Sequence, residues 1–361
     1  MTKIPFTKSL NLKTKPSVEK IAFGSTFTDH MFMMEYKDNS WLNPRVVPFD
    51  DFQISPAASV LHYGQAIFEG MKAYKNEKGQ AYIYRTKDHL NRLNDSAKRL
   101  CMPEVPVDLA DEAIKYFVSV EKDWIPNPST GGSLYLRPFM IATDNLLGVR
   151  PSNSYLFFVI ASPVGNYYPT GSLTPITLLI EREYARSAFG GVGTAKTSGN
   201  YAASLKAQVH AVKSGCSQVL WLDSSEKKYV EEVGSMNVFF VKKNGDVITP
   251  CLSQGTILSG ITRKSVIQVL KDHGRKVEEK RIRIDELLAG IANGEITEAF
   301  GTGTAVVISP IGNFLDGENK VQVGNGKTGE LTNWLYGKIR SIQKDEDSCN
   351  KYKEWLDFVG E

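Results

Sequence analysis

The stretch GGVGTAKTSGNYAASLKAQ, residues 190–208, carries one lysine, Lys196, between a glycine-rich approach and the start of a predicted helix. It nearly matches the phosphate-binding pattern Gly-x-x-x-x-Gly-Lys-Ser/Thr, but Ala195 stands where the second glycine belongs. Lys196 could hold a nucleotide phosphate, or its amine could act as a nucleophile. An exposed lysine in a flexible loop is the third, plainer alternative.

Two features of the neighbouring sequence bear on the phosphate-loop hypothesis. The segment VLWLD (219–223) resembles the apolar strand whose final Asp holds magnesium in such enzymes. However, the segment before Gly190, EREYARSAFG, is polar and does not suit the buried strand that must lead into a phosphate loop. Ala195 also adds a methyl group where the backbone must approach phosphate closely. The sequence therefore disfavours a P-loop.

A nucleophilic lysine agrees better with the surrounding residues. An amine whose pKa is lowered can form a Schiff base with an aldehyde cofactor. The small residues around Lys196 leave room for a flat ring; they are Gly193, Thr194, Ala195 and Gly199.

Three later segments, in a consistent order, favour such a cofactor. YVEEVGSMNVFF (229–240) places carboxylates beside an apolar strand, and a carboxylate keeps a pyridine nitrogen protonated. GTILSGITRKS (255–265) is a turn leading into a helix. Ser259 could cap that helix, and the amides of Ile261 and Thr262 could bind a phosphate. FGTGTAVV (300–307) offers a second turn with hydroxyls and amides.

The bulk composition describes an ordinary globular protein. With 361 residues, 42% of them hydrophobic, the chain is expected to form two domains. A net charge of +3 without a basic tract argues against nucleic acid, and the apolar runs are too short for a membrane span. The first 20 residues lack the apolar core of a secretory signal and the arginines of a mitochondrial presequence. We expect a cytoplasmic protein without a zinc site or a disulfide framework, because the cysteines are far apart: Cys101, Cys216, Cys251 and Cys349.

Hydrophobic periodicity predicts a mixed α/β chain with a break near residue 170. We expect an N-terminal domain over residues 1–165, a linker over 166–173 and a C-terminal domain over 174–361 that carries Lys196. In the first domain the sequence predicts a hairpin over 30–49 turning at 37–40, a strand over 81–85 and adjacent antiparallel strands over 133–143 and 154–162. Leu90, Leu93, Ala97 and Leu100 predict a helix with Thr86 as its N-cap.

The second domain is predicted to continue the mixture of strands and helices. Ala202, Leu205, Val209 and Val212 lie on one face of the helix that follows Lys196. The other elements are strands over 176–181 and 218–223, a hairpin over 238–249 turning at Asn244-Gly245, a helix from about Thr262, a helix over 284–294, strands within 298–309 and a C-terminal helix around 331–339.

Taken together, these motifs give the chain a specific resemblance. It resembles the branched-chain amino acid aminotransferases, which bind pyridoxal 5′-phosphate on the fold shared with D-amino acid aminotransferases. This implies a two-domain α/β (α+β type) architecture, fold type IV of the pyridoxal-phosphate enzymes. The matching segments extend from near the start to about residue 310: FGSTFTDHMF (23–32), LHYGQAIFEGMKAY (61–74), LYLRPF (134–139), AKTSGNYAAS (195–204), EEVGSMNVFF (231–240), ILSGITRKS (257–265) and FGTGTA (300–305).

The resemblance implies a role for each residue around the cofactor. Lys196 would carry the cofactor as a Schiff base and move a proton between the substrate Cα and the cofactor C4′. Glu232 would pair with the pyridine nitrogen, and Tyr201 would bond the ring's 3′-oxygen. The phosphate would be held by Arg85, the amides of Ile261 and Thr262, and Thr304.

On the substrate side the resemblance implies an apolar pocket. Its walls would be Phe27, Tyr63, Phe68, Tyr135 and Tyr167. The Thr304-Ala305 turn and tyrosine hydroxyls would hold the α-carboxylate, and Arg137 would hold the distal carboxylate of glutamate or 2-oxoglutarate. Val149 would reach the neighbouring subunit's site, so a homodimer is expected.

Two departures from the family pattern follow. Val306 and Ser309 stand where the mammalian enzymes have a redox-sensitive C-x-x-C pair, so we expect no thiol switch of that kind. Ser235 replaces a threonine of many members, and the lost methyl group should slightly alter the fit of β-branched substrates.

The implied reaction is transamination between L-leucine, L-isoleucine or L-valine and 2-oxoglutarate. A D-amino acid aminotransferase and an aminodeoxychorismate lyase are the alternatives on the same fold. A P-loop NTPase and a non-catalytic binding module are the alternatives from other classes.

Overall fold

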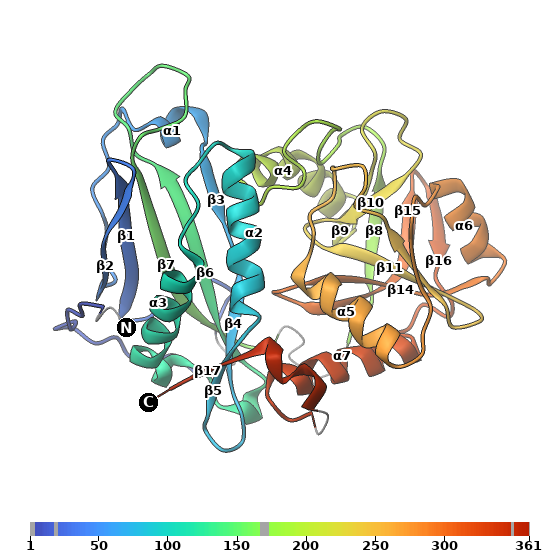
Figure 1. Ribbon diagram of the computed structural model, residues 1–361. Coiled ribbons are helices and arrows are strands. Elements are labelled where there is room, and N and C mark those ends of the chain that lie inside the picture. Colours follow the sequence, from blue (N-terminus) through green and yellow to red (C-terminus); the bar gives the residue numbers. More distant parts are fainter. Residues whose placement is uncertain (1–3, 18–20, 167–172, 348–349, 361) are drawn as a thin grey trace. The chain divides into compact units, whose positions relative to one another are not determined.

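The computed structural model describes residues 4–17, 21–166, 173–347 and 350–360. The chain divides into two compact units (Figure 1). Unit 1 comprises Met1–Pro169, Ala195–Ser198 and Ser341–Glu361, and unit 2 comprises Thr170–Thr194 and Gly199–Arg340. The division differs from the expected domain boundaries at two places, because residues 195–198 and 341–361 return to unit 1. Most of the expected linker, residues 167–172, lies outside the described residues.

Unit 1 is built on one mostly antiparallel sheet. Its strand order, within the described residues, is β17-β5-β4-β6-β7-β1-β2, with β3 paired to β6. The strands are β1 (His30–Lys37), β2 (Ser40–Pro48), β3 (Ala66–Phe68), β4 (Met71–Lys75), β5 (Ala81–Tyr84), β6 (Ser133–Ala142), β7 (Tyr155–Val164) and β17 (Leu356–Val359). The helices are α1 (Ser59–Tyr63), α2 (Thr86–Arg99) and α3 (Val107–Val120), with 3₁₀ turns η2 (Lys122–Trp124), η3 (Pro128–Thr130) and η4 (Asn350–Trp355).

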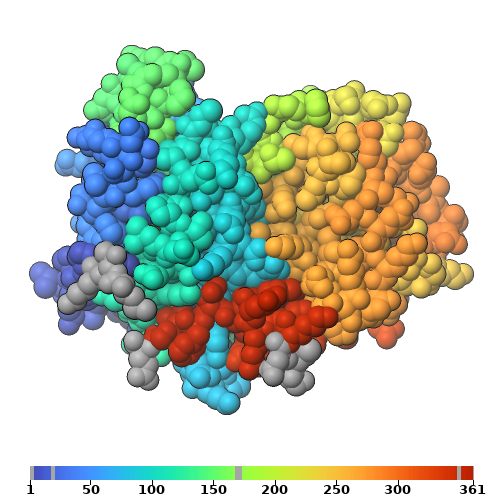
Figure 2. Space-filling view, viewed as in Figure 1, coloured from blue at the N-terminus to red at the C-terminus, as the bar shows by residue number. Residues whose placement is uncertain are grey.

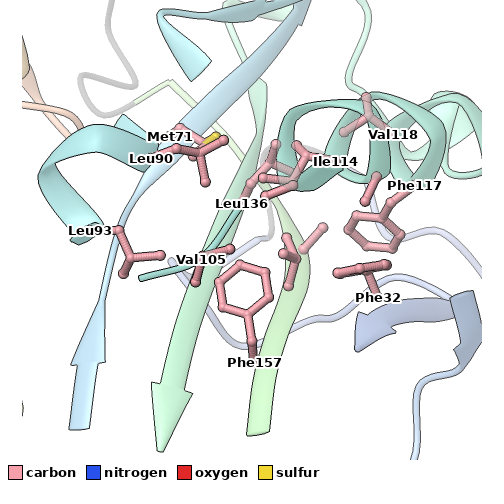
Figure 3. Close-up of a cluster of buried hydrophobic side chains, with 14 of the residues drawn as sticks. Phe32, Met71, Leu90, Leu93, Val105, Ile114, Phe117, Val118, Leu136 and Phe157 are labelled. Atoms are coloured by element: carbon pink, nitrogen blue, oxygen red, sulfur yellow. The ribbon is translucent and has the colours of Figure 1, made fainter. Parts of the chain in front are cut away.

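The core of unit 1 lies between the sheet and helices α2 and α3, which cover one of its faces (Figure 1). Figure 3 shows Leu90 and Leu93 of α2 and Phe117 of α3 among side chains from the strands, such as Leu136 of β6. The alternation along β6 sends Leu134, Leu136 and Met140 into this core and leaves the intervening side chains on the opposite face. That opposite face carries two predicted site residues.

Several local predictions for unit 1 are confirmed. Strands β1 and β2 form the hairpin, with Lys37 opposite Ser40, and Asp38 and Asn39 adopt the positive φ that tight hairpin turns require. Strands β6 and β7 are adjacent and antiparallel. The predicted cap of α2 is wrong by one residue: the N-cap is Arg85, in the left-handed conformation, and Thr86 is the first helical residue.

Unit 2 contains the second sheet. Within the described part of the chain its strand order is β10-β9-β8-β15-β14-β11-β12-β13, with β16 paired to β15. The strands are β8 (Ile176–Glu181), β9 (Gln218–Leu222), β10 (Val230–Val233), β11 (Asn237–Lys242), β12 (Val247–Pro250), β13 (Val277–Lys280), β14 (Ile296–Gly303), β15 (Val307–Asp316) and β16 (Asn319–Gln322). The helices are α4 (Ser198–Lys213), α5 (Ile261–Asp272), α6 (Ile284–Ala292) and α7 (Glu330–Gln343).

The elements predicted for this part of the chain are confirmed, including the β11–β12 hairpin and the β14–β15 pair. Helix α6 packs on one apolar cluster of the sheet, and α4 buries Ala207 and Ala211 against β8 and β9. The face of α4 that carries Ala202, Leu205, Val209 and Val212 is exposed. The apolar residues that α4 buries are alanines, and its larger apolar side chains point outward.

Candidate active site

Lys196 lies in a short segment that is fixed to unit 1 by its backbone. The Lys196 N–H donates to Ser96 Oγ (2.9 Å), and the Lys196 carbonyl accepts from the Phe68 N–H (3.0 Å). The next residue, Thr197, donates its hydroxyl to the Ala66 carbonyl (2.8 Å) and forms a β-bridge with Ile67. Strand β3 and helix α2 thus hold the lysine from two sides.

The Lys196 amine has the altered basicity that a proton carrier needs. Its Nζ lies 4.7 Å from the centre of the Phe68 ring. The pKa of the amine is lowered to about 8, chiefly by burial; the charges of Arg92 and Arg137 also lower it, and those of Glu69 and Tyr135 oppose them. Near neutral pH a useful fraction of the amine is therefore unprotonated.

Beside the lysine lies a buried charge cluster that the sequence analysis missed. Glu69 is completely buried and accepts two hydrogen bonds from the Arg92 guanidinium, at 2.7 and 2.8 Å. His89 Nδ1 lies 2.8 Å from the same carboxylate. Burial would raise the pKa of Glu69, but Arg92 and His89 hold it well below its ordinary value. Glu69 is therefore a permanent anion next to the lysine segment.

Arg85 is buried at the start of α2, in unit 1. Its backbone has φ 56°, an uncommon conformation for a residue with a side chain, and strain of this kind clusters at functional sites. Trp355 fixes it twice: the Trp355 carbonyl accepts from the Arg85 N–H (2.7 Å), and the indole ring lies 4.6 Å from the guanidinium carbon. Trp355, which the sequence analysis did not single out, thus orients a predicted phosphate ligand.

Tyr135 and Arg137 share the face of β6 that points away from the core. Arg137 donates to the Tyr135 hydroxyl (3.1 Å), and its guanidinium lies 4.8 Å from the Phe68 ring centre. Its Nε is buried and has no hydrogen-bond partner among the described residues. A buried donor without a partner suits an incoming carboxylate. Phe23, which the sequence motifs gave no role, lies edge-on to Tyr135, with the ring centres 5.0 Å apart.

The other predicted pocket residues of unit 1 are less enclosed. Phe27 stacks on Phe49 at 5.0 Å, and the Tyr63 hydroxyl donates to the Leu147 carbonyl. Val149 lies in the loop between β6 and β7, which is green in Figure 2, and 85% of it is exposed. Tyr167 falls outside the described residues.

In unit 2, Glu232 is buried on β10 and its carboxylate is held on both oxygens. Arg186 Nε lies 2.7 Å from one oxygen, and Asn237 donates to the other at 3.3 Å. Arg186 is itself anchored to the carbonyls of Gly193 and Thr256. Arg186 was not predicted as a site residue, because it lies in the polar segment EREYARSAFG before Gly190, which carries no motif of its own.

Helix α5 begins at Ile261 with Gly260 as its N-cap, so the predicted cap, Ser259, is one residue too early. Gly260 has no side chain with which to bond the first-turn amides, and a Cβ there would lie 2.0 Å from Asn237 Oδ1. Ile261 and Thr262 are both in the first turn of the helix. Their amides are at the positive end of the helix, where phosphate binds well.

The remaining predicted residues of unit 2 lie in two places. Tyr201 and Ser235 line a small, open hollow together with Arg186 and Leu258. Thr304 and Ala305 form the turn from β14 to β15 and are partly exposed. Val307, at the start of β15, has φ 65°, which is a genuine outlier for a β-branched residue. This strain marks the second Gly/Thr turn as a constrained loop.

The phosphate-loop alternative for Lys196 is wrong in this structure. Strand β8 ends at Glu181, and no strand lies between it and Gly190. Asp223, the proposed magnesium ligand, instead accepts the amides of Glu226, Lys228 and Tyr229. Although burial opposes it, these bonds lower the pKa of Asp223 to about 2. The described residues contain no cluster of three His, Cys, Asp or Glu side chains suited to a metal ion.

Within the described residues, no helix is long and apolar enough to cross a membrane.

Comparisons with known proteins identify the family and the fold of the chain. The amino-transferase class IV family model matches residues 66–314. The chain is 50% identical over 333 residues to branched-chain-amino-acid aminotransferase 2 of Bacillus subtilis, covering 92% of this chain and 91% of that protein. Its structure matches the branched-chain aminotransferase of Escherichia coli with a TM-score of 0.74 at 27% identity, covering 92% and 99% of the two chains.

A third match has the same TM-score of 0.74 at 25% identity: the branched-chain aminotransferase of Thermobaculum terrenum in its pyridoxal-phosphate form, covering 91% of this chain and 98% of that one. These matches confirm the α/β, D-amino acid aminotransferase-like fold. The chain therefore belongs to the class IV aminotransferases and, within them, to the branched-chain-amino-acid aminotransferase family.

Proposed function

We propose that the protein transfers the amino group of L-leucine, L-isoleucine or L-valine to 2-oxoglutarate, giving the branched-chain 2-oxo acids and L-glutamate. The observation that carries this proposal is the match over nine-tenths of the chain to branched-chain aminotransferases, combined with a lysine amine whose pKa is about 8. Class IV aminotransferases use pyridoxal 5′-phosphate, and so does this enzyme. When bound, this cofactor supplies an electron sink for the carbanion at the substrate Cα.

The residues present suit this cofactor in each unit. In unit 1, Lys196 would hold the cofactor covalently and Arg85 would bind its phosphate. In unit 2, the α5 amides of Ile261 and Thr262 suit the phosphate, because their cap residue is a glycine. Glu232 would bond the pyridine nitrogen, Tyr201 the ring's 3′-oxygen, and Thr304 a further phosphate oxygen.

Lys196 would also move the proton. At a pKa of about 8 its amine can accept a proton from the substrate Cα and return one at the cofactor C4′. Phe68 beside the amine excludes water on that side. Arg186 and Asn237 hold the Glu232 carboxylate in one orientation, which supports its proposed role as the partner of the pyridine nitrogen.

The substrate would meet apolar and cationic groups. Phe27, Tyr63, Phe68, Tyr135, Tyr167 and Ser235 would surround the branched side chain. Arg137 would take the distal carboxylate of 2-oxoglutarate, and its buried, unpartnered Nε supports that role. Ala305 and Thr304 would receive the α-carboxylate.

We further propose a cytoplasmic homodimer. Cys101, Cys216 and Cys251 are unpaired, as is usual in a reducing compartment. The exposed Val149 and the exposed apolar stripe of α4, defined as Ala202, Leu205, Val209 and Val212, support contact with a second copy of the chain. Val149 would contribute to the substrate site of that partner.

The visible absorbance spectrum of the purified protein tests the proposal. L-leucine should abolish the visible cofactor band, and 2-oxoglutarate should restore it. A response to D-alanine instead of L-leucine would favour a D-amino acid aminotransferase. Release of pyruvate from aminodeoxychorismate would favour the lyase. Retention of turnover by Lys196→Ala would contradict the role of Lys196.

A further inference from the structure

Helix α2 has a second buried face that is polar. Leu90, Leu93 and Ala97 face the apolar core, as their spacing predicts. His89, Arg92 and Ser96 recur at i, i+3 and i+7 and are also buried. Polar side chains at this spacing ordinarily face water, so their burial calls for partners. Those partners are Glu69 and the backbone of Lys196.

Ser96 uses its hydroxyl in both directions. Its Oγ donates to the Arg92 carbonyl (3.0 Å) and accepts the Lys196 N–H (2.9 Å). Because the Ser96 hydroxyl donates its hydrogen to its own helix, a lone pair of Oγ points toward the Lys196 backbone. The acceptor of the Lys196 N–H is therefore already oriented. With the Phe68 N–H on the Lys196 carbonyl, both peptide groups of the lysine are fixed.

Arg92 brings a positive charge of fixed orientation to the surroundings of the Lys196 amine. The two parallel hydrogen bonds that Arg92 donates to Glu69 hold the guanidinium in one orientation, and both side chains are buried. The Glu69 carboxylate is further bonded by His89 and by the Gly70 N–H (3.2 Å). The pKa of His89 is lowered, chiefly by burial, so the imidazole stays neutral and adds no competing charge.

Resting on the role proposed above for Lys196, we propose that Ser96, Arg92 and Glu69 are positioning residues for the proton transfer. Ser96 fixes the main chain from which the Lys196 side chain extends. Arg92, oriented by Glu69, destabilises the protonated amine. The effect of Arg92 on the pKa of Lys196 exceeds the opposite effect of Glu69, so the pair as a whole favours the neutral amine.

The first experiment removes the Ser96 hydroxyl. In Ser96→Ala the holoenzyme should keep its visible cofactor band, while kcat with L-leucine and 2-oxoglutarate falls about tenfold and KM changes less than about twofold. Asn94→Ala is the matched control: Asn94 is buried in the same helix and bonds Val105 in both directions, away from the lysine. It should lower the melting temperature and leave kcat unchanged.

The second experiment measures the lysine amine directly. In the pyridoxamine form of the enzyme, trace acetylation of Lys196 across a pH series, quantified by mass spectrometry, gives the midpoint of its titration. Arg92→Gln should move that midpoint to higher pH, and Glu69→Gln to lower pH. If a single variant does not fold, the double variant Glu69→Gln/Arg92→Gln removes both charges of the pair and so leaves no unpaired buried charge. It should also move the Lys196 midpoint to higher pH.

The outcomes separate this proposal from the assigned function. A Ser96→Ala enzyme with the kinetics of Asn94→Ala, or midpoints that move in the same direction in both single variants, would overturn the positioning network and leave the transaminase intact. Turnover in Lys196→Ala would overturn the function on which the network rests. Opposite midpoint shifts with a selective loss of kcat would support the network.

Discussion

At the scale of single residues, the proposed proton transfer depends on how one amine is kept from being fully protonated. Burial does most of this work for Lys196, and a neighbouring guanidinium does part of the rest. A lysine in water would be protonated at almost every site at neutral pH. The pKa of about 8 places its titration within the range where the enzyme can be assayed.

The first prediction concerns pH. As pH rises through about 8 the neutral fraction of Lys196 grows, so the single-turnover rate with L-leucine should rise and then level off. Stopped-flow absorbance measures that rate. Lys206→Arg, which keeps the charge of an exposed lysine in α4, should have the same profile. A rate independent of pH over this range would argue against Lys196 as the proton carrier.

The second prediction concerns Gly70, which lets Tyr135 approach the backbone. A Cβ on Gly70 would lie 1.9 Å from the Tyr135 hydroxyl, so Gly70→Ala must displace that ring and the Arg137 hydrogen bond with it. We expect KM for 2-oxoglutarate to rise about tenfold. Steady-state kinetics tests this. Gly337→Ala, which enters open space on a helix, is the control and should leave KM unchanged.

The sequence predicts individual site residues when a motif encloses them. Lys196, Glu232 and the α5 turn are predicted in this way, and their site roles stay predictions. Ser96 and Arg92 were missed because their spacing is also that of a solvated helix face. Arg186 was missed because a loop residue has no periodicity, and its partner, Glu232, is distant in the sequence.

At the scale of elements, the C-terminal segment of the chain holds the start of helix α2 and the proposed phosphate ligand Arg85. Strand β17 pairs with β5, and Asp357 accepts the Thr86 N–H at the start of α2 (3.1 Å). Trp355 covers Arg85. Periodicity predicts α2, α4, α5, α6 and α7 and many of the strands, but α1 and α3 were not predicted. It also gives no register between residues 81–84 and 356–359, since that pairing is set by tertiary packing.

The third prediction follows from this contact. Trp355→Ala should raise the Kd for pyridoxal 5′-phosphate about tenfold, or about 1.4 kcal/mol, because Arg85 loses its cation–π contact. Titration of the apoenzyme measures the Kd. Trp355→Phe should restore most of the affinity. Phe358→Ala, on β17 and away from Arg85, is the control. A lower melting temperature with unchanged Kd would contradict the prediction.

At the scale of the whole molecule, the exposed apolar stripe of α4 is the feature that a monomer does not explain. Leu205, Val209 and Val212 are each more than half exposed on a helix whose small residues face the sheet. Burying such a stripe against a second copy would remove apolar surface from water. The sequence predicts the stripe but not which of the two helix faces meets the sheet.

The fourth prediction tests that surface. Leu205→Glu should shift the protein from dimer to monomer, because a carboxylate would be buried in the contact. Size-exclusion chromatography with light scattering measures the mass. Ala203→Glu adds the same charge to an exposed position on another face of α4 and should remain dimeric. A dimeric Leu205→Glu would exclude this face as the interface.

Unit 1 is assembled from three separate parts of the chain, and the last of them supplies an outer strand of its sheet. During synthesis on the ribosome, β5 therefore remains an open edge while unit 2 is made, and it is covered only after β17 has followed. The sheet beside Arg85 is thus completed late, by two strands whose synthesis is separated by that of an entire second unit.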